Sequence, residues 1–132
     1  MSLKHKDLTD KILNAFYQVY NELGRGFLES VYESALEICL LEMNLSVERQ
    51  KDVSVYFHGQ NIGYFKPDII VNGCVILELK AVKEICSAHH AQILNYLKAT
   101  DIEVGLILNF GNKPDFKRFA FNNSSKNPRS SA

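Results

Sequence analysis

Residues 64–80 read YFKPDIIVNGCVILELK, and this stretch decides the fold. Two apolar runs, residues 64–71 and 74–82, lie on either side of Asn72-Gly73. Asn-Gly between such runs is among the strongest short-range signals of a β-hairpin, because both residues tolerate the positive φ angles of its tight turn. We therefore predict two antiparallel strands here.

The register of this hairpin determines which side chains can meet. In the second strand, Glu78 and Lys80 lie on one face because side chains alternate along a strand. A two-residue loop would turn Asp68 away from Glu78. A three-residue loop of residues 71–73, with Gly73 in the left-handed region and a bulge, puts both carboxylates on the same face. We predict this second register.

The spacing of apolar residues predicts the elements outside the hairpin. A period near 3.6 predicts helices over residues 8–23, over residues 31–43 and from Ser87, as the cap, to about residue 100. Alternation, or a continuous apolar run, predicts further strands over residues 53–57, 104–110 and 116–121. The order ααβββαβ(β) indicates an α/β (α+β) fold, in which helices flank a mixed β-sheet.

The length and composition are those of one soluble domain. A chain of 132 residues can bury one core but not two, so we expect a single domain over residues 1–121. Residues 122–132 are small and polar, which predicts a flexible tail. Hydrophobic residues make up 46% and charged residues 23%, which argues against a disordered or a membrane protein.

The cysteines and the net charge restrict the cellular context and the partners. The three cysteines are odd in number and widely spaced, which is typical of reduced thiols, so we expect a cytoplasmic protein. No apolar stretch is long enough to span a bilayer, so we expect no membrane partner. Fifteen basic residues balance fifteen acidic ones. The whole molecule therefore has no long-range attraction for nucleic acid, although a local basic rim remains compatible with neutrality.

Asp68, Glu78 and Lys80 together predict a hydrolytic metal site. Two carboxylates on one face repel each other unless a cation lies between them, and hard oxygen ligands suit Mg²⁺ or Mn²⁺. Lys80 can orient an attacking water or stabilise charge at phosphorus.

The same residues resemble the signature of the PD-(D/E)XK nuclease superfamily. Pro67-Asp68 is followed, ten positions after the aspartate, by Glu78-Leu79-Lys80. The resemblance implies a restriction-endonuclease-like fold in which Asp68 and Glu78 bind divalent metal and Lys80 assists catalysis.

Two more segments resemble the GxxExxY branch of that superfamily. Residues 26–32 read GFLESVY, and Glu29 then corresponds to a helix glutamate that completes the metal site. Residues 89–97 read HHAQILNYL and resemble a helix whose glutamine, here Gln92, projects toward the active site as a further catalytic residue. The substrate-binding candidates lie around these motifs: Lys66, where the family has arginine, His89, Tyr32 and Tyr96. Further candidates for phosphate contacts, which the sequence does not place on one surface, are Lys83, Lys113, Lys117 and Arg118.

The leading hypothesis is a Mg²⁺-dependent nuclease that hydrolyses phosphodiester bonds of DNA, and the preference for DNA comes from the resemblance alone. One alternative is a noncatalytic nucleic-acid-binding or assembly module that retains the fold, for example as a homodimer, since fold does not guarantee function. A third possibility is metal-dependent hydrolysis of a small phosphoester.

Overall fold

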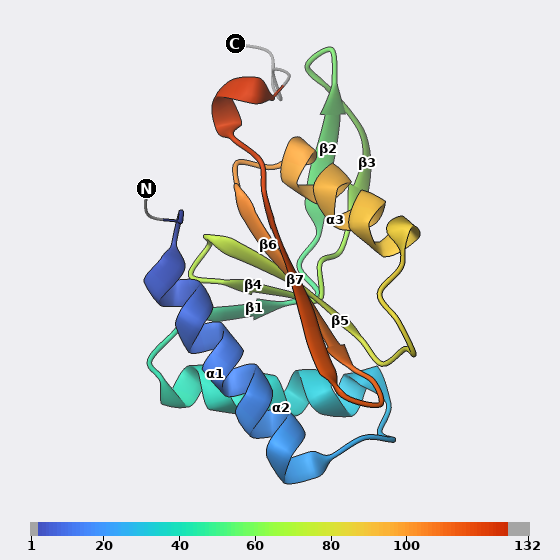
Figure 1. The fold of residues 1–132 in the computed structure, drawn as a ribbon. Coiled ribbons are helices and arrows are strands. Elements are labelled where there is room, and N and C mark those ends of the chain that lie inside the picture. The colour runs from blue at the N-terminus through green and yellow to red at the C-terminus, as the bar shows by residue number, and fades with distance from the viewer. Residues whose placement is uncertain (1–2, 127–132) are drawn as a thin grey trace.

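The computed structural model describes residues 3–126. A five-stranded sheet lies between two helices on one face and one helix on the other, and a two-stranded ribbon projects beside the third helix (Figure 1). The elements follow one another as α1 (Lys6–Leu23), α2 (Glu29–Glu42), β1 (Val47–Arg49), β2 (Val53–Phe57), β3 (Gln60–Phe65), β4 (Ile69–Val71), β5 (Val75–Lys80), α3 (Ser87–Ala99), β6 (Val104–Phe110), β7 (Pro114–Ala120) and the 3₁₀ turn η1 (Asn123–Ser125).

The main sheet has the strand order β1-β4-β5-β6-β7. Strands β5 and β6 run parallel, with α3 as the crossover between them, and the other neighbouring pairs are antiparallel. The mixed sheet flanked by helices, which the sequence predicts, is confirmed. No helix within residues 3–126 is long and apolar enough to cross a membrane.

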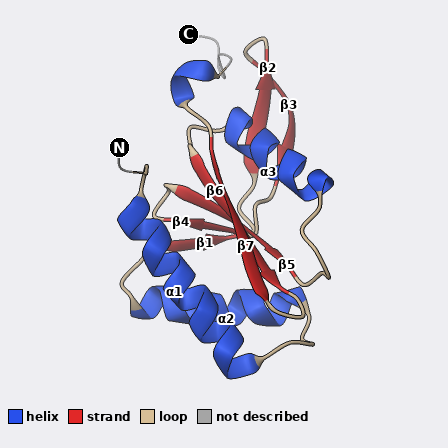
Figure 2. Cartoon of the chain, in the orientation of Figure 1, coloured by secondary structure: helices blue, strands red, loops and turns tan. Residues whose placement is uncertain are grey.

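The two faces of β5 are buried against different helices (Figure 2). Leu77 and Leu79 belong to the larger core, which α1 and α2 cover, whereas Ile76 packs with Leu97 of α3 on the opposite face. Because side chains alternate along a strand, Glu78 projects with Ile76 toward the side of α3. The candidate site is therefore formed on the face that carries only one helix.

The three helices and the Asn72-Gly73 hairpin are found where the sequence predicts them, but two strand predictions need correction. The three-residue strand β1 was not predicted. The single strand predicted over residues 64–71 is two strands, because β3 pairs with β2 in the separate ribbon while β4 joins the main sheet. Pro67, which has no N–H to donate to a strand, lies in the break between them.

Two terminal details also differ from the sequence interpretation. Cys86, and not Ser87, is the N-cap of α3. Residues 123–125, which the sequence assigns to the polar tail, form η1, and this segment docks on the loop before β6. Asn123 donates through Nδ2 to the carbonyl of Asp101 (3.1 Å), and Lys126 donates to the carbonyl of Ile102 (2.7 Å). Residues 127–132 lie outside the described residues.

The connections after β5 and β6 lie against each other at one end of the sheet. The Asn109 side chain accepts from the Val82 N–H (3.0 Å) and donates to the Val82 carbonyl (2.9 Å). The Tyr20 hydroxyl donates to the carbonyl of Gly111 (2.8 Å). A Cβ on Gly111 would lie 2.2 Å from the carbonyl oxygen of Val82, so only glycine fits at this contact.

We predict that Gly111→Ala destabilises the protein by about 1–3 kcal/mol, because the added methyl forces the two connections apart. The measurement is the free energy of unfolding in urea. Gly63→Ala is the matched control, since nothing lies within 4 Å of a Cβ placed there. Equal stabilities of the two variants would contradict the close contact at Gly111.

Candidate active site

The hairpin register brings Asp68 and Glu78 to the same face of the sheet. Ile69 pairs with Leu77 and Val71 with Val75, so Asp68, one residue before β4, faces Glu78. Directly opposite residues of an antiparallel pair project to the same side. The predicted same-face arrangement is confirmed.

The turn that produces this register is one residue further along than predicted. Asn72 and Gly73 both have positive φ, at 52° and 64°, and the Cys74 N–H donates to the Val71 carbonyl (2.9 Å). The three loop residues are therefore 72–74, and not 71–73. The shift moves the pairing by two positions, which leaves the faces unchanged.

Glu78 is a buried carboxyl group in an unfavourable environment for its charge. It is only 5% exposed, and its Oε1 has no hydrogen-bond partner within the described residues. Burial raises the pKa of Glu78 to about 9, and the neighbouring charge of Asp68 adds to the effect, with Lys80 opposing it. A cation beside the two carboxylates would offset both effects, because it stabilises the ionised form of Glu78.

Asp68 is held in place from two sides. Its Oδ2 accepts from the backbone N–H of Leu79 (2.8 Å), and its Oδ1 accepts from the side-chain amide of Gln50 (3.4 Å). The same amide donates to Glu33 (3.2 Å), whose other oxygen accepts from Nε of Arg49 (2.8 Å). Glu33 is 7% exposed, so this network links the buried side of α2 to the candidate site.

Lys80 lies on the same face as Glu78, two residues further along β5. The side chain is half-buried, and its ammonium group forms no ion pair within residues 3–126. It is close enough to Glu78 to favour the ionised form of that carboxyl group, which lowers its pKa. A free ammonium beside two carboxylates can contact a bound phosphate.

The third helix contributes a hydrogen-bonded pair on the same side of the sheet. The Gln92 amide donates to the Tyr96 hydroxyl (2.7 Å), and the Tyr96 ring stacks on Phe65 with the centroids 4.0 Å apart. Burial and the charge of Glu78 raise the pKa of Tyr96, so its hydroxyl remains a proton donor at neutral pH. His89 is a capping residue, because its Nδ1 accepts from the Cys86 N–H (3.1 Å).

Three residues predicted for the site are buried in the core or exposed, and among the described residues none of them forms a hydrogen bond or ion pair with Asp68 or Glu78. Tyr32 is 0% exposed, and its hydroxyl donates to the Gly24 carbonyl (2.6 Å), so it is a core residue and the substrate-binding prediction is wrong. Glu29 is exposed at the first residue of α2. Lys66 is exposed and lies 3.7 Å from an oxygen of Asp52.

The three carboxylates predicted as metal ligands do not form one cluster. Among the described residues, no group of three or more histidine, cysteine, aspartate or glutamate side chains is arranged to hold a metal ion. The pair of Asp68 and Glu78 remains. Mg²⁺ is commonly bound by one or two carboxylates, with waters and substrate phosphate as the other ligands, so the pair fits this ion.

Sequence reasoning missed Glu33 and Gln50. Glu33 lies one helical turn after Glu29, on the face that also carries Tyr32, and that spacing was the available signal. Gln50 gave no signal, because its position depends on a left-handed backbone (φ 52°) after β1.

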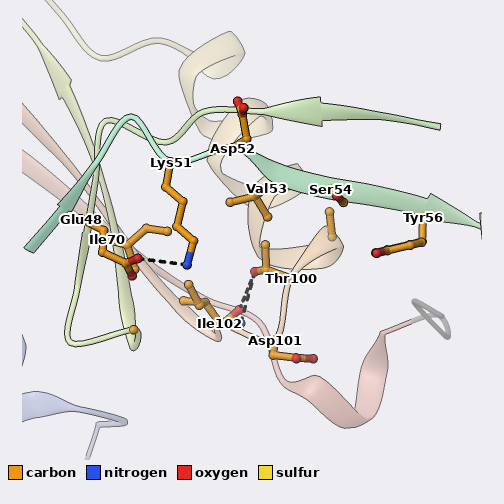
Figure 3. A pocket seen from close by; sticks show the side chains of 12 residues that line it. Glu48, Lys51, Asp52, Val53, Ser54, Tyr56, Ile70, Thr100, Asp101 and Ile102 are labelled. Atoms are coloured by element: carbon orange, nitrogen blue, oxygen red, sulfur yellow. Dashed lines mark hydrogen bonds and ion pairs between the residues drawn. The ribbon is translucent and has the colours of Figure 1, made fainter. Parts of the chain in front are cut away.

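A separate pocket of about 680 Å³ lies between β2 and the end of α3 (Figure 3). Its lining includes Val53, Ile70 and Thr100, and its cation, Lys51, pairs with Glu48 (3.0 Å). Asp68, Glu78 and Lys80 do not line it. The pocket therefore carries none of the chemistry described above.

The sequence matches the family described as the PD-(D/E)XK nuclease superfamily over residues 6–119, and the chain belongs to this superfamily. No curated protein sequence matches the chain. The structure is similar to one titled "Crystal structure of SSO0001", with a TM-score of 0.54 and 17% identity, covering 88% of this chain and 59% of the other. This chain thus spans about three fifths of that protein.

Two weaker structural similarities are to nucleases. One is Hjc, a Holliday junction resolvase from Archaeoglobus fulgidus, with a TM-score of 0.43 and 17% identity over 69% of this chain and 75% of the other. The second is the alkaline exonuclease LHK-Exo from Laribacter hongkongensis, with a TM-score of 0.44 and 11% identity over 93% and 74%. The mixed sheet flanked by helices, together with the match to the PD-(D/E)XK superfamily, bears out the restriction-endonuclease-like fold that the sequence resemblance implies.

We predict that Tyr32→Phe lowers the free energy of unfolding by about 1–2 kcal/mol, because the Gly24 carbonyl loses its buried donor. Tyr96→Phe is the matched control, and it should change stability by no more than about 0.5 kcal/mol since Tyr96 is only half-buried. Urea denaturation measures both. A Tyr32→Phe protein as stable as the wild type would show that the hydroxyl has no structural role.

Proposed function

We propose that this protein is a Mg²⁺-dependent nuclease that hydrolyses phosphodiester bonds in DNA. One observation carries the proposal: in a chain of the PD-(D/E)XK superfamily, a buried Glu78 oxygen without a partner lies opposite Asp68 and beside Lys80. The preference for DNA over RNA rests on the resemblance of residues 26–32 and 89–97 to the GxxExxY branch.

The residues proposed to hold Mg²⁺ are Asp68 and Glu78. Their oxygen atoms suit a hard cation, and the cation would compensate the charge of Glu78, which burial disfavours, and the repulsion between the two carboxylates. When bound, Mg²⁺ would supply Lewis-acid stabilisation of negative charge on a phosphoryl oxygen. Glu29 is left outside this ligand set because it is exposed at the start of α2.

Lys80 and Tyr96 are proposed to act on the substrate. In hydrolysis, water adds to phosphorus, one phosphorus–oxygen ester bond breaks, and the leaving oxygen takes up a proton. The Lys80 ammonium orients the water or stabilises the charge that develops on phosphorus. The Tyr96 hydroxyl accepts from Gln92, which leaves its own proton free to donate to a phosphate oxygen.

The network behind Asp68 is proposed to fix the carboxylate for metal binding. Asp68 accepts from both Leu79 and Gln50, so its side chain has little freedom to rotate. Ligands oriented by a second layer of hydrogen bonds bind metal more tightly than free ones. Glu33 takes part by holding Gln50 from the other side.

We predict that millimolar Mg²⁺ or Mn²⁺ raises the melting temperature of EDTA-treated protein by about 2–8 °C, because the ion binds the folded state alone. Glu78→Gln and Asp68→Asn should abolish this rise. Lys80→Ala should retain the rise but lower the rate of DNA cleavage by roughly 10²–10⁴-fold, since it removes a charge that acts on the transition state.

Cleavage is measured on single-stranded, double-stranded and branched DNA, with RNA of the same sequence beside them. Glu42→Gln is the control, because Glu42 is exposed at the far end of α2 and should leave both readouts unchanged. Cleavage that persists in EDTA, or in the double variant Glu78→Gln with Lys80→Ala, contradicts the proposal. A protein with neither thermal shift nor cleavage is the noncatalytic module instead.

A further inference from the structure

A groove of about 480 Å³ lies at the end of the sheet where β5 and β6 finish. Three lysines, Lys83, Lys113 and Lys117, line it together with Asn109, and the two carboxylates in the lining are Glu84 and Asp115. The lysines come from the β5–α3 connection, the β6–β7 turn and β7. Figure 1 shows these connections at the same end of the molecule. The structure thus places three cations from two separate segments of the chain on one surface.

A neighbouring groove extends this surface. It shares Lys83 and Asn112 with the first groove and adds Arg25 from the α1–α2 connection. The Arg25 guanidinium donates to the Asn112 side chain (3.3 Å), which fixes the arginine beside the β6–β7 turn. Four cations therefore face two carboxylates here, although the net charge of the whole chain is zero.

Among the described residues, the three lysines of the groove have no acidic partner, unlike several other lysines on the surface. Lys4, Lys6 and Lys51 pair with carboxylates at 2.8, 2.6 and 3.0 Å. None of the three groove lysines forms an ion pair within the described part of the chain. Asp115, the nearest candidate on β7, accepts instead from the Phe116 N–H (2.9 Å). The groove therefore offers uncompensated positive charge.

The groove continues the row of side chains that contains the candidate active site. Glu78 pairs with Ile107 of β6, and Ile107 pairs with Lys117 of β7, so these residues face the same side of the sheet. Lys80 likewise pairs with Asn109, which lines the groove. Neighbouring strands lie about 4.8 Å apart, which puts the Lys117 backbone roughly 10 Å from that of Glu78. One nucleic-acid strand can span this separation.

From this geometry we infer that the groove of Lys83, Lys113 and Lys117 binds the phosphate backbone of a nucleic-acid strand next to the phosphate that is cleaved. The inference rests on the proposed function, because it assumes that the candidate active site at Asp68 and Glu78 cleaves the same strand. Lysine ammonium groups contact phosphate as point charges and read no base, so the groove positions the strand without selecting its sequence.

The test compares Lys83→Gln/Lys113→Gln/Lys117→Gln with a control, Lys11→Gln/Lys51→Gln/Lys98→Gln, which removes equal charge elsewhere. Binding of labelled single-stranded and duplex oligonucleotides is measured by fluorescence anisotropy in EDTA over a range of salt concentrations. We expect the groove variant to bind roughly 10- to 100-fold more weakly, with a salt slope smaller by about 2–3, because each lost phosphate contact removes about 0.7–0.9 from it. The control should bind as the wild type does.

A second measurement separates the groove from the chemistry. Hydrolysis of bis(4-nitrophenyl) phosphate with Mg²⁺ needs only the catalytic residues, so the groove variant should retain its rate while its KM for oligonucleotide rises. Equal binding by groove variant and control overturns the inference, as does a wild type that binds no oligonucleotide at low salt. Failure of the wild type to hydrolyse the small diester or DNA would count against the proposed function instead.

Discussion

The candidate site depends on the pairing register of β4 and β5, which the three-residue loop 72–74 imposes. Asn72 and Gly73 both adopt positive φ, a conformation open to few other residues, and the chain then returns with Val75 opposite Val71. A slip of one residue would exchange the two faces of one strand, directing Asp68 into the core that α1 and α2 cover. The chemistry of the site is thus a consequence of backbone geometry several residues away.

The same register makes the site unfavourable for folding. Leu77 and Leu79 anchor β5 in the large core, and Glu78 on the opposite face of the strand is only 5% exposed. A buried carboxyl beside Asp68 opposes folding in its ionised form, and a single ammonium, Lys80, offsets only part of this. Such departures from the rules that govern the rest of a core concentrate at functional sites, where a ligand supplies the missing interaction.

Local sequence patterns predicted most of the architecture and, at the candidate site, the pair of Asp68 and Glu78. The helices and the hairpin follow from apolar spacing and turn residues, which act within a few residues of each other. The short β1 strand and the division of β3 from β4 depend on pairing between distant segments, which no local period reports. The same holds for the site: Asp68 and Glu78 follow from one hairpin, whereas the contact of Gln50 with Glu33 requires β1 to lie beside α2.

Tyr32 belongs to the motif of residues 26–32, but it is a buried residue that stabilises the fold. Its ring stacks on Phe110 with centroids 4.3 Å apart, and its hydroxyl ties the start of α2 to Gly24. A tyrosine that fixes where α2 begins also fixes the position of Glu33, one residue later, and through it Gln50 and Asp68. The motif therefore acts on the site through the orientation of a helix. The net charge of the chain does not reveal the site either. The charges of a carboxylate pair and of a basic groove have opposite signs and add to zero, although each group creates a strong local field.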